Sequence, residues 1–347
     1  MDRVWDASVD LVLERQIGLN WCWAATAKGI VDYYGGPVLP QCRYATHFLH
    51  QTEGCCDGNE QSARCDAAHD IDSVLRHFGV FAPPPFRRSV HLMTLRRELE
   101  RDRPVIALMQ FRDGTVHALA ITALDAAGQI VRYSDPWYGP QPDSRAVHDF
   151  TNNYEGGGRW TYTILTRPQH SQPDAAISFL QDRFKDEQRR LSHHARQTSA
   201  AVNLDVYVIG PGPLAAGEDP QNAERLPECT VSLDSAPSDD ASRLERVLLG
   251  MRDDIDARRA RGFNVRVLRV PSVMLTALWF VREDGRACAD THYVPVEPAP
   301  YFFQAGQEYT LREFRELLVE PARRALRSNE INRKFIERLD RETEHSG

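Results

Sequence analysis

The chain has 347 residues, of which 42% are hydrophobic and 26% charged, and its net charge is −7. The length predicts two domains, and the composition is typical of a soluble globular protein. The acidic balance argues against a nucleic-acid-binding protein, which needs a basic patch, and no apolar run is long enough to cross a membrane. The opening residues, MDRVWDASVD, have neither a basic start nor an apolar stretch, which predicts a cytoplasmic protein without a signal peptide. Signal-less secretion is left open.

Helical patterns dominate the first hundred residues. Apolar residues at helical spacing predict a helix that begins near Trp21–Trp23 and ends at Gly35. A short helix is also expected at Leu95–Arg101. Two further helical patterns flank a loop rich in Cys and Gly, and they cover Cys42–Leu49 and Ala67–Phe78.

The pattern changes to strands after residue 104. Apolar or alternating segments, separated by Asp113-Gly114 and Ala127-Gly128, predict successive antiparallel strands joined by tight turns. The expected strands are Val105–Phe111, Ala118–Leu124, Ile130–Ser134 and Trp160–Leu165. Helices followed by a sheet predict an α+β fold.

The second half of the chain predicts a second domain. Residues 169–200 have one apolar face on a charged segment, which predicts a linker helix between domains at 1–168 and 201–347. Residues 211–240, rich in Pro, Ala, Asp and Ser, are expected to form a loop. Strand-like segments and two helical stripes, the second behind a Thr310 cap, predict a C-terminal α/β or α+β domain of unknown role. These segments are Leu204–Ile209, Val265–Val270, Met274–Val281 and His292–Val296 for the strands, and Leu244–Ile255 and Phe314–Ala325 for the helices.

Cys22 is the candidate nucleophile because it lies at the predicted start of a helix. The helix dipole and the unpaired backbone N–H groups there favour the thiolate, which is the nucleophilic form. Gln16 lies six residues earlier, and its side-chain amide could donate a hydrogen bond to an oxyanion beside the sulfur, with the Cys22 backbone N–H as a second donor. Taken alone, a cysteine beside two tryptophans is more often a small buried core residue.

His117 and Asp135 are the candidate base and its partner. His117 opens one predicted strand, and Asp135 ends the next in the run Ser-Asp-Pro-Trp. Both lie about eight or nine residues from the centre of the connecting turn, so they are expected to be cross-strand neighbours. An aspartate that accepts from one ring nitrogen fixes the tautomer and leaves the other nitrogen facing the thiol. Singly, a structural histidine and a turn aspartate before proline are the more common cases.

The series Gln-x5-Cys-Trp, Val-His-Ala and Asp-Pro-Trp resembles the papain-like cysteine peptidases, most closely the bacterial C39-like and C70 (AvrRpt2-type) families. The resemblance covers residues 10–166 and implies a papain-like fold. It implies that Cys22 is the nucleophile, His117 the general base and Asp135 the third member of the triad. Gln16 would complete the oxyanion hole, and Trp137 would shield the third residue. Plant-type papains have asparagine at the third position, whereas the bacterial branches have aspartate, as here.

The reaction that this resemblance implies is hydrolysis of a peptide bond through a thioester, with no metal ion and no organic cofactor. The substrate would be a protein or peptide, and residues 201–347 would select substrates or bind a regulatory partner. Two other functional classes remain open. A similar triad serves acyltransferases and transglutaminase-like enzymes, in which an amine replaces water, and a protease scaffold can also be a non-catalytic binding protein.

Cysteines are concentrated near the start of the chain, where five of the seven precede residue 66. The odd total leaves at least one unpaired. Free thiols are the default expectation for a reducing cytoplasm. Zinc binding is a weaker alternative, because the spacing fits no paired C-x2-C motif. The C70-like resemblance extends to this segment and suggests disulfides that join Cys55 and Cys56, one each, to Cys42 and Cys65.

Overall fold

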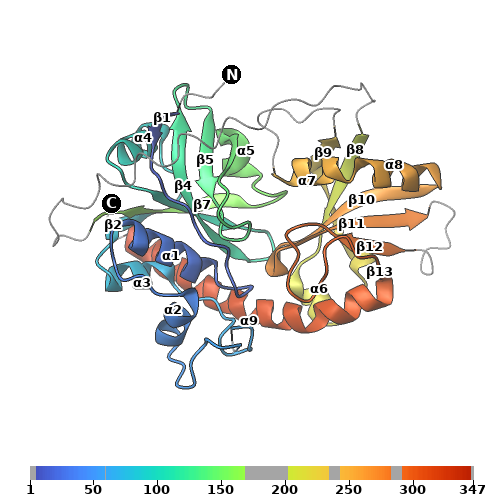
Figure 1. Ribbon diagram of the computed structural model, residues 1–347, viewed down its shortest axis with the longest axis horizontal. Coiled ribbons are helices and arrows are strands. Elements are labelled where there is room, and N and C mark those ends of the chain that lie inside the picture. The colour runs from blue at the N-terminus through green and yellow to red at the C-terminus, as the bar shows by residue number, and fades with distance from the viewer. Residues whose placement is uncertain (1–4, 59, 169–201, 234–242, 283–290, 345–347) are drawn as a thin grey trace.

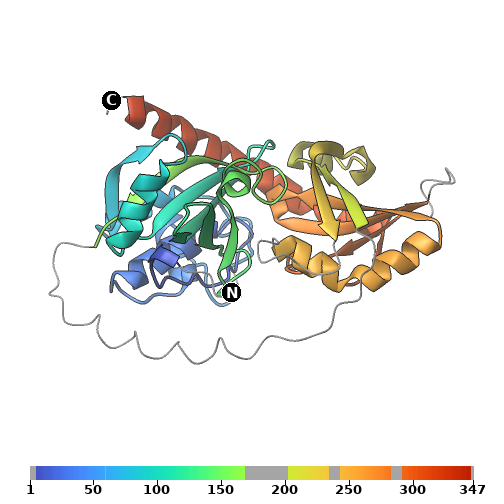
Figure 2. The same ribbon diagram turned by 90° about the horizontal axis from the view of Figure 1, so that it is seen from above.

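The computed structural model describes residues 5–58, 60–168, 202–233, 243–282 and 291–344. One sheet lies in an N-terminal lobe (residues 5–168) and the other in a C-terminal lobe (residues 202–310), side by side (Figure 1). The long helix α9 (Leu311–Glu344) passes along both lobes, which is clearest from above (Figure 2). The predicted linker helix at 169–200 lies outside the described residues. None of the described helices is both long and apolar enough to span a membrane.

The helices predicted for the first hundred residues are confirmed. α1 begins at Cys22, as its pattern indicates, and the third predicted helix begins four residues later than expected, at Ile71. These helices are α1 (Cys22–Tyr33), α2 (Gln41–Phe48), α3 (Ile71–His77) and α4 (Leu92–Glu100). A further short helix, α5 (Val147–Asn152), was not predicted.

The N-terminal sheet is antiparallel throughout, in the order β2-β7-β3-β4-β5-β6, with β1 paired to β4. The four strands predicted here are confirmed as β3 (Val105–Gln110), β4 (Val116–Asp125), β5 (Ile130–Ser134) and β7 (Arg159–Thr166). The strands that were not predicted are β1 (Trp5–Ser8), β2 (Phe81–Phe86) and β6 (Asp143–Ala146). Helices packed against an antiparallel sheet make this an α+β fold, as expected.

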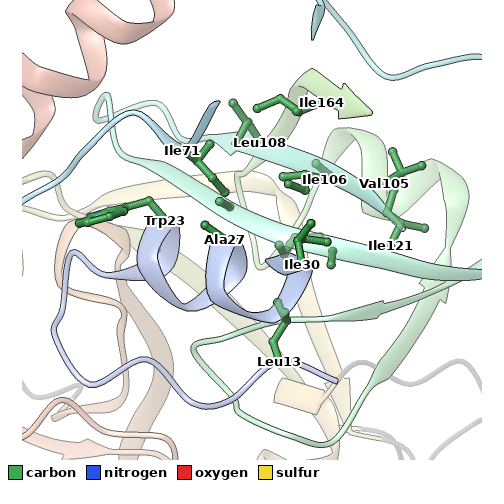
Figure 3. Packing of buried hydrophobic residues seen from close by; sticks show 14 of the residues in the cluster. Leu13, Trp23, Ala27, Ile30, Ile71, Val105, Ile106, Leu108, Ile121 and Ile164 are labelled. Carbon is green, nitrogen blue, oxygen red and sulfur yellow. The ribbon is translucent and has the colours of Figure 1, made fainter. Parts of the chain in front are cut away.

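The apolar face of α1 packs on this sheet. Figure 3 shows Ala27 and Ile30 of α1 directed toward Ile106 and Ile121 of the central strands, while Leu13 lies on the other side of the helix. All five side chains are buried. The helix is therefore fixed between the sheet and the segment that precedes it, which determines where its first residue, Cys22, lies.

The C-terminal sheet is mixed, in the order β13-β12-β11-β10-β8-β9, with only β8 and β10 parallel. Its strands are β8 (Val202–Val208), β9 (Glu224–Leu233), β10 (Phe263–Val270), β11 (Leu275–Arg282), β12 (His292–Pro295) and β13 (Tyr309–Thr310). The short elements between them are α6 (Pro211–Ala215), η2 (Pro220–Asn222), α7 (Arg243–Gly250), α8 (Arg252–Ala260) and η3 (Pro271–Val273).

Three expectations for this half of the chain need correction. The loop predicted at 211–240 contains α6, η2 and the edge strand β9. The single helix predicted over Leu244–Ile255 is two helices, because α7 ends at Gly250 and α8 begins at Arg252. The last helix continues far beyond Ala325, and its final turns place Phe335 and Leu339 in the core of the N-terminal lobe.

The start of α9 is as predicted. The backbone N–H of Glu313 donates to the Thr310 hydroxyl at 3.3 Å, and the backbone N–H of Thr310 donates to the Glu313 carboxylate at 2.9 Å. This reciprocal pair satisfies two helix-end donors at once. The division of the chain into domains at 1–168 and 201–347 stays a prediction, because α9 contributes to both cores.

Candidate active site

Cys22 is the first residue of α1 and is only partly buried, whereas the residues that follow it are buried. Its predecessor Trp21 makes no side-chain cap, so the first-turn backbone N–H groups stay available to an anion. Two indole N–H groups fix the helix start: Trp21 donates to the Cys65 carbonyl at 2.7 Å and Trp23 to the Ala67 carbonyl at 3.0 Å. The helix end that presents the sulfur is therefore anchored to the cysteine-rich loop.

The side chains of three predicted site residues lie close together, namely those of Cys22, His117 and Asp135. His117 Nε2 lies 2.8 Å from Asp135 Oδ1, and both residues are 2% exposed. The Cys22 side chain is near enough to the imidazole to help raise the pKa of His117, and its sulfur also lies 3.9 Å from the Val116 carbonyl. The pairing differs in detail from the expected one. The strand register pairs Ala120 with Ser134, so Asp135 does not lie directly opposite His117 and the two meet diagonally. They still share a face, because His117 lies three residues from Ala120 and Asp135 one residue from Ser134, and both separations are odd.

Asp135 is held by three donors. Besides His117, the backbone N–H of Trp137 donates to Oδ1 at 2.7 Å, and the Tyr154 hydroxyl donates to Oδ2. Tyr154 is fully buried in an aromatic cluster with Tyr133 and Phe150. Sequence reasoning missed Tyr154, since it follows a short unpredicted helix and no local pattern links it to Asp135.

The charges on the buried His117 and Asp135 side chains stabilise each other. Burial by itself disfavours a charged imidazole, but the Asp135 charge, its hydrogen bond and the Cys22 contact together raise the pKa of His117 to about 10. Burial likewise disfavours a charged carboxylate, but the attraction of His117 and the hydrogen bonds from His117, Tyr154 and Trp137 lower the pKa of Asp135. Near neutral pH the arrangement favours an imidazolium hydrogen-bonded to a carboxylate and facing a sulfur.

Gln16 is not brought into contact with this group. Its side chain is 5% exposed, and its amide nitrogen donates to the carbonyls of Gly18 at 2.9 Å and Leu19 at 2.8 Å. Its amide oxygen is buried without a hydrogen-bond partner among the described residues. The predicted oxyanion role of Gln16 therefore stays a prediction, because the amide N–H groups point at loop carbonyls in this conformation.

The cleft beside Cys22 has two walls. The N-terminal lobe provides Cys22, His117 and apolar neighbours such as Leu108 and Ile71. The opposite wall comes from residues far along the chain, namely Pro271, Ser272, Met274, Asn329, Asn332 and Phe335. Sequence reasoning gave these residues no role, and no local motif marks them, because their place at the cleft results from contacts between the lobes.

The cysteine-rich loop is cross-linked by two disulfides. Cys42 is bonded to Cys56, and Cys55 to Cys65. The default expectation of free thiols is wrong here, and the pairing agrees with the disulfide alternative. These sulfurs are bonded to one another and cannot ligate zinc. Over the described residues, no group of three or more His, Cys, Asp or Glu side chains is arranged to hold a metal ion.

Comparison with known protein families finds a match within the N-terminal lobe. Residues 6–155 match the family model described as papain-like cysteine protease AvrRpt2, of the C70 peptidases. The matched segment contains Cys22, His117 and Asp135, and it ends before the C-terminal lobe begins. No curated protein matches the chain.

Proposed function

We propose that this cysteine peptidase, papain-like over residues 6–155, hydrolyses peptide bonds through a triad of Cys22, His117 and Asp135. One observation carries the proposal: three side chains from α1, from β4 and from the end of β5 meet in series beside a cleft. A cysteine at a helix N-terminus, paired with an imidazole that a buried carboxylate orients, is the arrangement of an activated thiol.

The reaction would proceed by acyl transfer. The Cys22 thiolate attacks the peptide carbonyl, and the negative charge that develops on oxygen is met by the Cys22 backbone N–H at the start of α1. His117 then protonates the leaving amine, and a thioester forms on sulfur. Water activated by His117 hydrolyses the thioester, while Asp135 holds the imidazole in place throughout.

Gln16 would supply the second oxyanion donor only after a local change. Its amide nitrogen is hydrogen-bonded to two loop carbonyls, so it would have to leave both when substrate binds. This predicts a moderate contribution that grows in the transition state. In a Gln16→Ala variant, kcat should therefore fall by a larger factor than KM rises, because the new hydrogen bond forms only as the oxyanion develops.

The direct test is the Cys22→Ala variant, assayed on a mixed peptide library with products identified by mass spectrometry. Cleavage should disappear while thermal unfolding stays unchanged, and Cys229→Ala, a cysteine outside the matched segment, should retain activity. Product masses separate the two enzyme classes, because hydrolysis adds water to the fragments whereas an acyltransferase joins them to an amine. Full activity in Cys22→Ala would overturn the proposal, and a wild-type Cys22 that resists alkylation would favour a binding protein.

The remaining parts of the proposal concern the role of the C-terminal residues and the compartment in which the protein works. We infer a substrate- or partner-selecting role for residues 201–347, connected through residues 169–200, with protein substrates and no nucleic acid. A cytoplasmic location, as the sequence predicts, would expose both disulfides to reduction. A free-thiol count on protein isolated from a reducing and from an oxidising compartment would distinguish the two settings.

A further inference from the structure

Glu155 lies at the contact between the two lobes, directly after Tyr154 in the chain. Its side chain is 1% exposed, and its carboxylate contacts two arginines and a tyrosine. Arg145 lies 3.1 Å from one carboxylate oxygen, whereas Arg269 at 3.0 Å and the Tyr138 hydroxyl at 2.9 Å contact the other. Arg145 and Tyr138 belong to the N-terminal lobe, but Arg269 lies on β10 of the C-terminal lobe. At Glu155, a charge from outside the matched segment therefore contacts the N-terminal lobe.

Two tyrosines connect Glu155 with Asp135. The Tyr154 hydroxyl donates to Asp135 Oδ2, and Tyr154 directly precedes Glu155 in the chain. Tyr138 lies in the turn that follows Asp135. Its backbone N–H donates to the Asp135 carbonyl at 3.1 Å, and its hydroxyl donates to the Glu155 carboxylate. Burial raises the pKa of both hydroxyls well above the usual range, so both remain donors. The position of Glu155 therefore affects both the side chain and the backbone of the residue that orients His117.

The backbone at Glu155 depends on support from its surroundings. Its φ of +48° lies in the left-handed region, which favours glycine, and a residue with a side chain keeps this conformation where neighbouring contacts impose it. The turn that follows packs on the C-terminal sheet. A methyl group added to Gly156 would lie 3.6 Å from Val206 of β8. One added to Gly157 would lie 3.7 Å from Leu226 of β9. The C-terminal lobe therefore supports the backbone of this turn as well as the Glu155 side chain.

The Arg269 side chain is oriented by its own sheet. Arg269 and Thr276 are cross-strand partners on β10 and β11, and Arg269 Nη1 donates to the Thr276 hydroxyl at 2.7 Å. The same nitrogen donates to Glu155, so one positive charge at this point makes both contacts. Without that charge, the buried Glu155 carboxylate would lose part of its compensation, which is costly. It would then shift toward its remaining partners or take up a proton, and in either case the contacts around it would change.

We propose that Arg269 is a positioning residue of the triad, which acts through Glu155 to keep Asp135 aligned with the imidazole. The inference rests on the proposed peptidase function and gives the C-terminal lobe a part in it. If Arg269 is lost, the two tyrosines no longer hold the aspartate in register, and the imidazolium that faces the nucleophilic sulfur loses stabilisation. Residues 6–155 would then not form a complete active site by themselves.

The first test uses substitutions of Arg269 in the full chain, assayed on a peptide that the wild type cleaves and under conditions where each variant is folded. Arg269→Gln should lower kcat about tenfold with KM almost unchanged, because Arg269 lies outside the cleft and does not contact substrate. Arg269→Lys should recover most of the loss, since one nitrogen makes both contacts. A Lys variant as slow as the Gln variant, or a loss confined to KM, would overturn the inference.

The matched control is Arg338→Gln. Arg338 on α9 lies 2.6 Å from Asp72 of α3, whose side chain is fully buried, so this variant also loses an ion pair to a buried carboxylate of the N-terminal lobe. It should keep the wild-type kcat, because its partner is not beside Tyr154. An equal fall in kcat for Arg338→Gln and Arg269→Gln would show a general effect of lost stability and would overturn the inference.

A double-mutant cycle tests the route through Glu155. If Arg269 acts through this carboxylate, the effects of Glu155→Gln and Arg269→Gln on kcat should not add, and the double variant should lie within about twofold of the slower single variant. Effects that multiply would overturn the inference. The double variant also serves if Arg269→Gln does not fold, because it leaves neither of these two positions with an unpaired charge.

Alkylation of Cys22 by iodoacetamide at pH 6, followed by peptide mapping, gives a readout that does not need turnover. An imidazolium aligned by Asp135 supports the thiolate, so Arg269→Gln or the double variant should react about tenfold more slowly than wild type, the factor that one pKa unit represents. Arg338→Gln should react at the wild-type rate. A wild type that cleaves no peptide would refute the peptidase proposal, and this rate would still decide the positioning role. Equal alkylation rates in wild type and Arg269→Gln would overturn the inference.

Discussion

Replacing Asp135 with asparagine separates the electrostatic role of the triad from its shape. The amide has nearly the size of the carboxylate but carries no charge, so burial would dominate the environment of His117. The pKa of His117, about 10 in the wild type, should then fall to 6.5 or below. A fall of at least about 3.5 in pKa corresponds to ~5 kcal/mol of lost preference for the imidazolium.

The consequence for catalysis can be worked out from protonation alone. At pH 8 only about 3% of an imidazole with a pKa of 6.5 carries the proton that the leaving amine needs, so kcat/KM should fall by about thirtyfold. Loss of orientation adds to this factor. In the wild type, the alkaline limb of the kcat/KM profile should lie near pH 10, and in Asp135→Asn it should move to about 6.5 or lower.

Stability should follow the same titrations. The His117 contribution is fully present below 6.5 and is lost as the pH rises through about 10, whereas the Asp135 contribution is present above 3.8 and is lost as the pH falls. Asp149→Asn is the control for the pH profile of kcat/KM, because the Asp149 side chain is 60% exposed on α5. An Asp135→Asn enzyme that keeps its alkaline limb near pH 10 would refute the reasoning.

Three further predictions concern the scaffold. Replacing Cys42 and Cys56 with serine should lower the free energy of unfolding by about 3 kcal/mol in denaturant titration, because the bond closes a loop with a sequence separation of 14; an unchanged midpoint would contradict this. Arg269→Met should cost about 3 kcal/mol by the same titration, because it breaks the buried ion pair between the lobes, whereas the exposed control Arg312→Met should cost almost nothing. Gly29→Ala should lower stability by ~1–3 kcal/mol, since the new methyl would lie 2.3 Å from a buried side chain of the preceding segment; a rise in the thermal midpoint would be inconsistent with the packing of α1.

Local sequence patterns were sufficient to predict a helix or a strand where one of its faces is apolar and the other polar. The start of α1 at Cys22 and the strands that place His117 and Asp135 follow from such patterns and from the glycines at their turns. The contact between His117 and Asp135 was also predictable, because antiparallel strands joined by a short connection bring their far ends together. The bulge near Thr122 changed the register but not the contact.

The strands that were missed lie mainly at sheet edges, where the sequence signal is weak. β2 has the sequence FAPPPF, and β9 also contains proline, a residue that edge strands tolerate and central strands do not. The full length of α9 was missed for another reason. Its second half has fewer apolar residues and many charged ones. Ion pairs within the helix, such as those of Arg333 with Glu330 and Glu337, help to stabilise it there.

The far wall of the cleft could not be derived from any local pattern. It depends on α9 crossing from one lobe to the other and on η3 approaching the turn before His117. The orientation of the Gln16 amide was likewise invisible, because it is decided by two loop carbonyls that have no sequence signature. Contacts between segments more than a hundred residues apart decide the far wall, whereas hydrogen bonds to carbonyls two and three residues away decide the orientation of the Gln16 amide.

The chemical step itself can be observed by acid-quenching the enzyme during turnover of a peptide that it cleaves and measuring the intact mass. The proposed mechanism predicts a transient acyl adduct that fragment mapping places on Cys22 and that hydroxylamine releases, as expected of a thioester. Peptide hydrolysis that proceeds with no adduct in wild type, and at the same rate in Cys22→Ala, would contradict the account.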